Sequence, residues 1–331
     1  MTNPDRRPDE VTLSSGDEPR GVQVMTPREV PLGGPRAMHV RRTLPQRSRS
    51  LIGAWCFIDH YGPDDVEETG GMSVAPHPHT GLQTVSWLFE GEVEHRDSAG
   101  NHAMVRPGEL NLMTGGRGIS HSEVSPPSTS VLHGVQLWVA LPDASRHTPP
   151  TFDHYVPPAV RGPRWEARVF LGSALGSTSP VPTHSPLLGA EIMLATGGSL
   201  TVDVDDSFEH GVLLDVGLIS VDGEELKPGE LAYLAPGRSV IEVAAGEEAR
   251  LVLVGGPPFG EEIVMWWNFV GRSHEEIVGY RAEWQDQITR DGEIVSDSRE
   301  VSDGRFGVVA DQPLPPIPAP ALPNVRLKLR R

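Results

Sequence analysis

Two short motifs in the first half of the chain could together bind a metal ion. His77 and His79 are two residues apart in APHPHTG, and His121 and Glu123 have the same spacing in GISHSEV. Side chains at i and i+2 of a β-strand point to one side, so each motif would direct two ligands the same way. If the two pairs lie on facing strands, all four side chains could converge on one ion.

The four candidate ligands would make a mixed nitrogen and oxygen site. Three imidazoles and a carboxylate suit iron, manganese, nickel, copper or zinc, and suit calcium poorly. A six-coordinate ion would keep two positions for water, dioxygen or an oxygen-bearing substrate, as Lewis-acid or oxidative chemistry requires. The chain has 13 His, so a single HxH is more often structural than ligating. The second pair after a Gly-rich turn reverses that balance.

The segments around these motifs have the pattern of short β-strands. Apolar runs bounded by Gly, Pro, Asp or Asn recur from Val22 onward, as expected of a sandwich or barrel. The runs include VQVM, TVSWLF, ELNLM and GVQLWVAL, and after a Pro-rich passage at 149–163 they include EIMLAT, LTVDV and RLVLVG.

An internal repeat divides the chain into two similar units. Residues 106–117 read RPGELNLMTGGR and residues 227–238 read KPGELAYLAPGR, which indicates equivalent hairpins in two duplicated barrels. The offset of the repeat places Gly198, Leu200, Glu242 and Ala244 opposite the four candidate ligands. We therefore expect no equivalent metal in the second barrel, and a structural role for the isolated His210.

The composition suggests four segments. We expect a disordered polar tail at 1–21, a metal-binding barrel at 22–155, a barrel without metal at 156–290 and a Pro-rich tail at 291–331 that is either extended over the surface or mobile. A short helix should begin near Ser273, which has capping-box spacing to Glu276. The helix would bury Ile277, Tyr280 and Trp284 on one face.

Charge and hydrophobicity exclude several classes of protein. With 28 basic and 45 acidic residues the formal charge is −17, which disfavours direct binding to nucleic acid. No stretch of about 18 apolar residues and no signal-peptide core occurs, so we expect a soluble cytoplasmic protein without membrane contact. Cys56 is the one cysteine and lies in the apolar run AWCFI, where it reads as a core residue.

Several longer motifs resemble the pirin family, a branch of the cupin superfamily with two jelly-roll barrels. They are GAWCFIDHYGP (53–63), HPHTGLQTV (77–85), FEGEVEHRDSAGN (89–101), RPGELNLMTGGRGISHSE (106–123) and, more weakly, WWNFVGRSHEEI (266–277). The resemblance implies that His77, His79, His121 and Glu123 hold the metal, which are the same four residues that the spacing selects.

One position departs from the family pattern. Many pirins have Glu four residues after the second His, where this chain has Gln83. Counting alternation from His79, we expect Gln83 to line the pocket, where its amide could orient water or substrate but not act as a base. The role of base would then pass to Glu123.

Other polar and aromatic residues have plainer interpretations. His95 and Asp97 in EHRDSAG are expected to shape a surface hairpin rather than to take part in chemistry. Trp87, Trp138, Phe57 and Met113 lie in strand patterns and are expected in the core, unless one of them lines the metal cavity and contacts an aromatic substrate.

The resemblance implies two functions of different classes. One is an oxidoreductase, a metal-dependent dioxygenase of the quercetin 2,3-dioxygenase type that uses Fe(II), or else Mn, Ni, Cu or Zn, with a flavonol-like substrate and dioxygen. The other is a non-enzymatic, metal- or redox-responsive regulator that acts through a protein partner. Both require the metal pocket, and the residues alone favour neither strongly.

Overall fold

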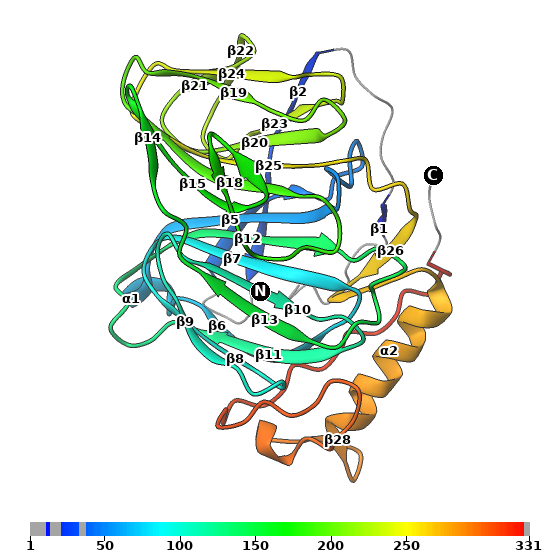
Figure 1. Ribbon diagram of the computed structural model, residues 1–331. Coiled ribbons are helices and arrows are strands. Elements are labelled where there is room, and N and C mark those ends of the chain that lie inside the picture. Colours follow the sequence, from blue (N-terminus) through cyan, green and yellow to red (C-terminus); the bar gives the residue numbers. More distant parts are fainter. Residues whose placement is uncertain (1–10, 14–20, 33–37, 328–331) are drawn as a thin grey trace.

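Short apolar runs separated by Gly and Pro turns form two β-barrels, one stacked on the other (Figure 1). The computed structural model describes residues 11–13, 21–32 and 38–327, so most of the tail expected at 1–21 lies outside the described residues. The expected all-β, two-barrel class is confirmed.

The first barrel has a large sheet and a small sheet. The seven-stranded sheet has the order β13-β10-β7-β12-β5-β4-β3, and the four-stranded sheet has the order β6-β11-β8-β9. Its elements are β3 Arg28–Leu32, β4 Met38–Leu44, β5 Trp55–Asp65, α1 Val66–Thr69, β6 Ser73–His79, β7 Leu82–Glu90, β8 Val93–Asp97, β9 His102–Val105, β10 Leu110–Thr114, β11 Ile119–Val124, β12 Val131–Ala140 and β13 Thr151–Tyr155.

The second barrel repeats this arrangement. Its sheets have the orders β14-β15-β18-β25-β20-β23-β2 and β19-β24-β21-β22. The repeated segments supply β10 and β23, which occupy the same place in the two large sheets. The elements are β2 Val22–Met25, β14 Val160–Gly162, β15 Trp165–Leu171, β16 Ser173–Ala174, β17 Ser177–Thr178, β18 Leu188–Leu194, β19 Ser199–Asp203, β20 Glu209–Val216, β21 Ile219–Val221, β22 Glu224–Leu226, β23 Leu231–Leu234, β24 Val240–Ala245 and β25 Ala249–Gly256.

A continuous hydrophobic core joins the two large sheets face to face. Trp87 of the first barrel lies 4.7 Å from Phe170 of the second, measured between ring centroids. The backbones also approach closely, because a Cβ added to Gly53 would lie 2.7 Å from the Cα of Gly256. Such a contact tolerates no larger residue at position 53, and it holds the barrels at a fixed separation.

A buried polar cluster also crosses this interface. Asp215 of β20 accepts hydrogen bonds at Oδ1 from Nε2 of His60 (2.7 Å) and of His133 (2.6 Å), and Arg250 lies 3.3 Å from its Oδ2. His60, His133 and Asp215 have the composition of a metal site. However, the separations are those of hydrogen bonds, and Arg41 adds a positive charge 3.3 Å from His60 Nε2. We interpret the cluster as a hydrogen-bonded link between barrels.

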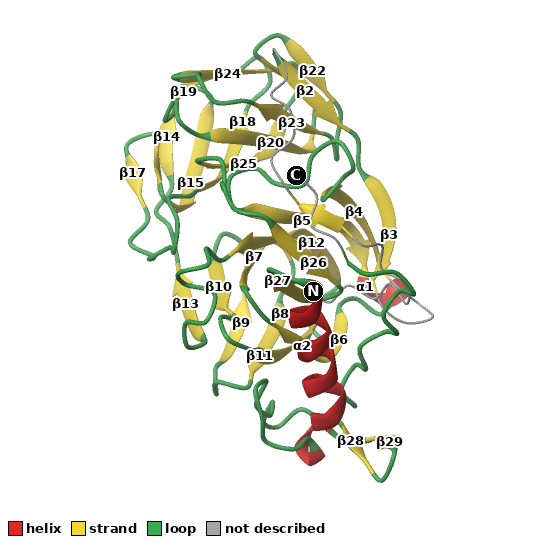
Figure 2. Ribbon diagram, turned by 90° about the vertical axis from the view of Figure 1, so that its right-hand side faces the viewer, coloured by secondary structure: helices red, strands yellow, loops and turns green. Residues whose placement is uncertain are grey.

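The two ends of the chain exchange barrels. Strand β2, near the amino terminus, pairs with β23 in the second barrel. The chain after the second barrel returns to the first, where its strand at Phe269–Gly271 contacts β6 and α2 packs against that strand (Figure 2). The returning segment contains β26 Ile263–Trp266, which pairs with β1 Val11–Leu13, followed by β27 Phe269–Gly271, α2 His274–Gln287, β28 Thr289–Arg290, β29 Glu293–Ile294 and a 3₁₀ turn at Ser298–Glu300.

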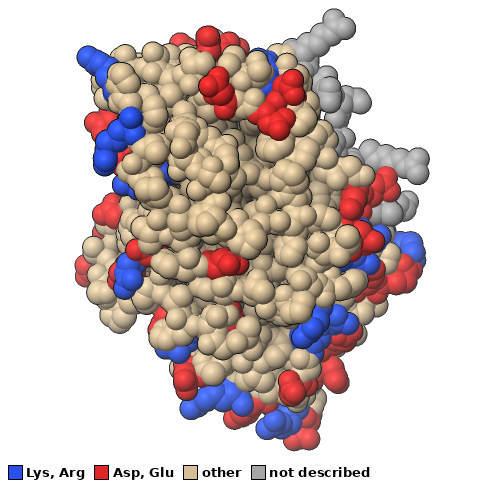
Figure 3. Space-filling view, viewed as in Figure 1, with Lys and Arg blue, Asp and Glu red and all other residues tan. Residues whose placement is uncertain are grey.

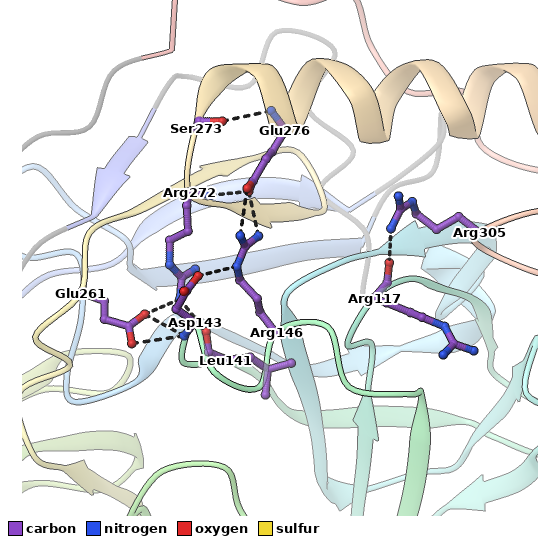
Figure 4. Close-up of polar contacts among 9 residues, drawn as sticks. All are labelled: Arg117, Leu141, Asp143, Arg146, Glu261, Arg272, Ser273, Glu276 and Arg305. Carbon is purple, nitrogen blue, oxygen red and sulfur yellow. Dashed lines mark hydrogen bonds and ion pairs between the residues drawn. The ribbon is translucent and has the colours of Figure 1, made fainter.

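The helix α2 begins where its capping residue predicts. Ser273 accepts a hydrogen bond from the Glu276 amide (3.2 Å), and Ile277, Tyr280 and Trp284 are buried. The Glu276 carboxylate accepts from the amide of Arg272 (2.7 Å) and from both terminal nitrogens of Arg146 (2.9 and 3.0 Å; Figure 4). This bidentate pair ties the start of α2 to the loop after β12.

The surface and the single thiol agree with the composition. On the face shown in Figure 3, basic side chains are dispersed among acidic ones rather than gathered into one patch. No helix of the described chain is long and apolar enough to cross a membrane. Cys56 is fully buried, and burial raises the pKa of its thiol to about 12, as suits a core residue.

We expect Asp215→Asn to lower the free energy of unfolding by about 3 kcal/mol, because a buried ion pair that loses one partner leaves the other uncompensated. Despite burial, the hydrogen bonds from His133 and His60 hold the pKa of Asp215 at about 2, against 3.8 ordinarily. The stabilisation is therefore present above pH 3.8 and is lost as the pH falls towards 2. Denaturant titrations at several pH values measure it.

Arg161→Ala is the matched control for this prediction, because it removes an ion pair with Glu166 in which the Arg side chain is 67% exposed. Its effect should stay below about 1 kcal/mol. An equal effect of the two substitutions would contradict the assignment of Asp215 as a link between the barrels.

Candidate metal centre

The two candidate motifs lie side by side in one sheet. Strand β6 pairs with β11 in antiparallel fashion, and His77 lies directly opposite His121. A bulge between His121 and Glu123 shifts the register, so that Glu123 pairs with Val74. The expectation of facing strands therefore needs correction: the pairs meet as neighbours, and both strands direct their ligands towards the barrel interior.

Three imidazoles converge inside the first barrel. The ring centroids of His77, His79 and His121 lie 4.4 to 5.0 Å apart, and one ring nitrogen of each lies within 4.8 Å of the others. The Nε2 atoms of His79 and His121 are 3.1 Å apart. That separation suits two nitrogens that share a hydrogen bond in the metal-free protein and an ion in the loaded protein.

Backbone carbonyls select the tautomer of two of these imidazoles. The Nδ1 of His77 lies 2.9 Å from the carbonyl oxygen of Ala75, and the Nδ1 of His79 lies 3.2 Å from that of Asn268. Because a carbonyl only accepts, each Nδ1 carries the proton and each Nε2 presents a lone pair. Metal-binding histidines in proteins are oriented in this way.

The imidazole cluster fits a cation because it leaves one ligand atom without a partner. His77 Nε2 is buried and has no hydrogen-bond partner among the described residues. Burial lowers the pKa of all three imidazoles, that of His77 to about 3, so they are neutral at neutral pH and free to ligate. A buried, unsatisfied lone pair costs free energy that an ion would recover.

Glu123 adjoins the imidazole cluster at His121. Together with His95 these two residues form a second group whose ligand atoms lie within 4.8 Å of one another. Strands of the large sheet hold the carboxylate from the other side, since Ser86 Oγ donates to Oε1 (3.2 Å) and Gln136 Nε2 lies 3.3 and 3.4 Å from its oxygens. These donors stabilise the ionised carboxylate.

Gln83 points away from the metal centre, contrary to the expectation from alternation. Its Nε2 donates to Thr114 Oγ1 (2.9 Å), on the face of β7 that carries Val85 towards the core between the barrels. Ser86, on the opposite face, reaches Glu123. The count from His79 fails because β6 ends there and the turn at 80–81 starts a new strand with a new phase.

His95 lies inside the barrel rather than on a surface hairpin. It is 3% exposed, its Nδ1 is 3.4 Å from Nδ1 of His121, and its ring stacks on Phe152 at 4.8 Å. Asp97, 3.4 Å from His95 Nε2, is buried too and shapes the following turn by accepting from Asn101. The apolar Val93 two residues earlier was the signal that this face of β8 points inward.

Aromatic side chains border the imidazoles. Trp138 lies 5.1 Å from the ring of His79 and stacks on Phe57 at 4.2 Å. Trp87, by contrast, belongs to the core between the barrels, and Met113 is buried in β10. Trp138 thus contacts a candidate ligand directly, and Phe57 packs against Trp138.

The second barrel has an apolar interior where the first has the candidate ligands. The inward side chains of β19 and β24 are Leu200, Val202, Ile241 and Val243, all in one hydrophobic core, whereas Glu242 is exposed. His210 lies near the start of β20 with both ring nitrogens unpartnered among the described residues, and burial lowers its pKa to about 4. No group of three or more metal-ligating side chains in the described chain includes it.

Protein purified without added metal should contain about one equivalent of a transition metal, and His121→Ala should lose at least nine-tenths of it, because His121 belongs to both ligand groups. Elemental analysis gives the occupancy. The matched control is His102→Ala in the same small sheet, where the imidazole is exposed and bonds to Glu94 (2.7 Å). Full occupancy in the His121 variant would refute the proposed coordination.

Known proteins share this fold and these motifs. The family model of Pirin matches residues 37–139, and that of the Pirin C-terminal cupin domain matches residues 189–289. A protein of Pseudomonas aeruginosa, provisionally named quercetin 2,3-dioxygenase, is 43% identical over 278 residues, which are 82% of this chain and 86% of the relative. Human pirin is 33% identical over 210 residues, 61% of this chain and 72% of its own length.

A solved structure extends the likeness to nearly the whole chain. The crystal structure of quercetin 2,3-dioxygenase from Acinetobacter baumannii superposes with a TM-score of 0.83 at 36% sequence identity, covering 93% of this chain and 98% of that one. Both barrels are therefore cupin domains, and the chain belongs to the pirin family.

Proposed function

We propose that this protein is a metal-dependent dioxygenase of the quercetin 2,3-dioxygenase type. The observation that carries the proposal is the convergence of three neutral imidazoles, with the Nε2 of His77 buried and unpartnered, beside a carboxylate that is held in place. The names of the two most similar relatives described above support the reaction class.

The ligand set of the proposed centre is His77, His79, His121 and Glu123. Such a set suits Fe(II) best in our proposal, with Mn, Ni, Cu or Zn as alternatives. The bound ion would supply Lewis-acid polarisation of the substrate oxygens and a redox centre for dioxygen.

Glu123 is the proposed base. A flavonol reacts as its enolate, so the enol proton must leave, and the Glu123 carboxylate is the anionic group that adjoins the imidazoles. Ser86 and Gln136 keep its oxygens oriented towards the interior. Gln83 has no part in this step, because its amide bonds to Thr114 on the far side of β7.

The aromatic pair beside His79 would bind the substrate rings. Trp138 and Phe57 stack on each other, and a planar flavonol could lie along this apolar wall while its oxygens reach the centre. The four ligands are at most 1% exposed, so a substrate of this size reaches them only when the groups that cover them move aside.

Incubation of the iron-loaded protein with quercetin, in air and without oxygen, tests the proposal. We expect oxygen-dependent ring opening detected by mass spectrometry, and Glu123→Gln should reduce the rate at least 100-fold because the amide cannot accept the proton. Gln83→Glu is the matched variant, since the side chain lies behind β7. Its rate should stay within about threefold of the unsubstituted protein if it folds with the same melting temperature.

Two results would contradict this function. One is the absence of oxygen-dependent cleavage with any of the five metals. The other is a Glu123→Gln variant that turns over quercetin at the rate of the unsubstituted protein.

The burial of the ligands favours a second candidate, a redox-responsive regulator. A centre that is at most 1% exposed can change its charge on oxidation without admitting a large substrate, and the change would act on the barrel surface. A pull-down with ferrous and with ferric protein distinguishes the two functions. A partner whose affinity depends on the oxidation state supports the regulator, and equal binding in both states opposes it.

A further inference from the structure

A segment after α2 lies along the outside of the strands that carry the metal ligands. We call residues 304–320 the C-terminal strap. Its backbone and side chains bond to β6 and β11, because Ser120 Oγ donates to the carbonyl of Phe306 (2.9 Å) and Gln312 Nε2 donates to Ser122 Oγ (3.1 Å). The amide of Ile317 donates to the carbonyl of Pro76 (2.8 Å).

Each of these contacts is next to a ligand in the sequence. Ser120 and Ser122 flank His121 on β11, and Pro76 precedes His77 on β6. Because side chains alternate along a strand, the serines point out of the barrel while the imidazole points in. Phe306, Gln312, Ser120 and Ser122 are all at most 5% exposed, so these are buried contacts rather than loose surface ones.

The strap is itself held at several points by α2. Trp284 Nε1 donates to the carbonyl of Ile317 (2.8 Å), and Gln287 Oε1 accepts from the amide of Phe306 (3.0 Å). The helix is in turn tied to the first barrel through Glu276 and Arg146 (Figure 4). The strap is thus joined to the first barrel both directly and through α2.

The same returning segment also touches a ligand directly. The carbonyl of Asn268, just before β27, accepts from Nδ1 of His79 and sets its tautomer. Neither matching family model includes the strap, since they end at residues 139 and 289. The contacts to β11 therefore come from outside the part of the chain that the two family models describe.

We propose that the C-terminal strap is a positioning element of the metal centre, and that Gln312 is its main positioning residue. By holding Ser122, Gln312 fixes the bulged stretch of β11 in which His121 and Glu123 lie, so the ligands meet the ion without rearrangement. This inference rests on the metal site of the proposed function. In other proteins, residues that orient metal ligands without touching the metal typically raise the affinity for the metal about 10- to 100-fold.

The test uses Co²⁺ as the probe with the full-length protein. We expect Gln312→Ala to raise the dissociation constant for Co²⁺ about tenfold and to change the visible spectrum of the bound ion, which reports ligand geometry. Ser122→Ala should have a similar effect. The double variant should be no weaker than either single one, because both remove the same hydrogen bond.

The matched control is Gln285→Ala, which removes a hydrogen bond from α2 to the far end of the strap, at the Ala319 amide (2.6 Å); among the described residues the Gln285 side chain makes no hydrogen bond to β6 or β11. It should lower the melting temperature of the metal-free protein yet leave Co²⁺ affinity within about twofold. The strap proposal fails if Gln312→Ala also binds within twofold of the unsubstituted protein, or if the control weakens binding as much. Absence of Co²⁺ binding by the unsubstituted protein instead overturns the metal site, and the strap proposal with it.

Discussion

The antiparallel pairing of β6 with β11 is the constraint on which the rest of the site depends. It places His77 opposite His121 at the spacing of neighbouring strands. Alternation along both strands then directs the other candidate ligands to the same side. The inward positions meet to form a cluster of lone pairs. The outward positions, among them Ser120 and Ser122, are left for the returning chain to bind. A shift of one residue in this register would exchange the two faces and remove the site altogether.

The two barrels have the same architecture but different interiors. Their large sheets share one hydrophobic core, so each barrel shields the large sheet of the other from water. In the second barrel the inward positions of β19 and β24 are aliphatic and the interior supplies stability. In the first, the candidate ligands replace part of that core, and the apolar clusters around Trp138 and Phe57 and around the returning segment with α2 pack elsewhere on the same barrel.

Patterns with a short range in sequence predicted most of what the structure shows. The spacing of His77, His79, His121 and Glu123 depends only on strand period, and the repeat near residues 106 and 227 indicated two barrels without reference to their contacts. Gln83 was misplaced because a turn resets the phase of alternation. The burial of His95 depends on which sheet closes over β8, and the positions of β2 and the strap depend on partners about 200 residues away. Local pattern carries no information about such pairings.

The exchange of chain ends between barrels has a consequence for how the protein is made. Strand β2 is synthesised some 200 residues before its partner β23. The first barrel likewise waits for the segment that supplies the carbonyl of Asn268 and the contacts to β11. Neither barrel can therefore be completed before most of these elements have been made. The candidate ligands reach their final arrangement only once the returning segment has been synthesised, so this architecture places metal acquisition after that point.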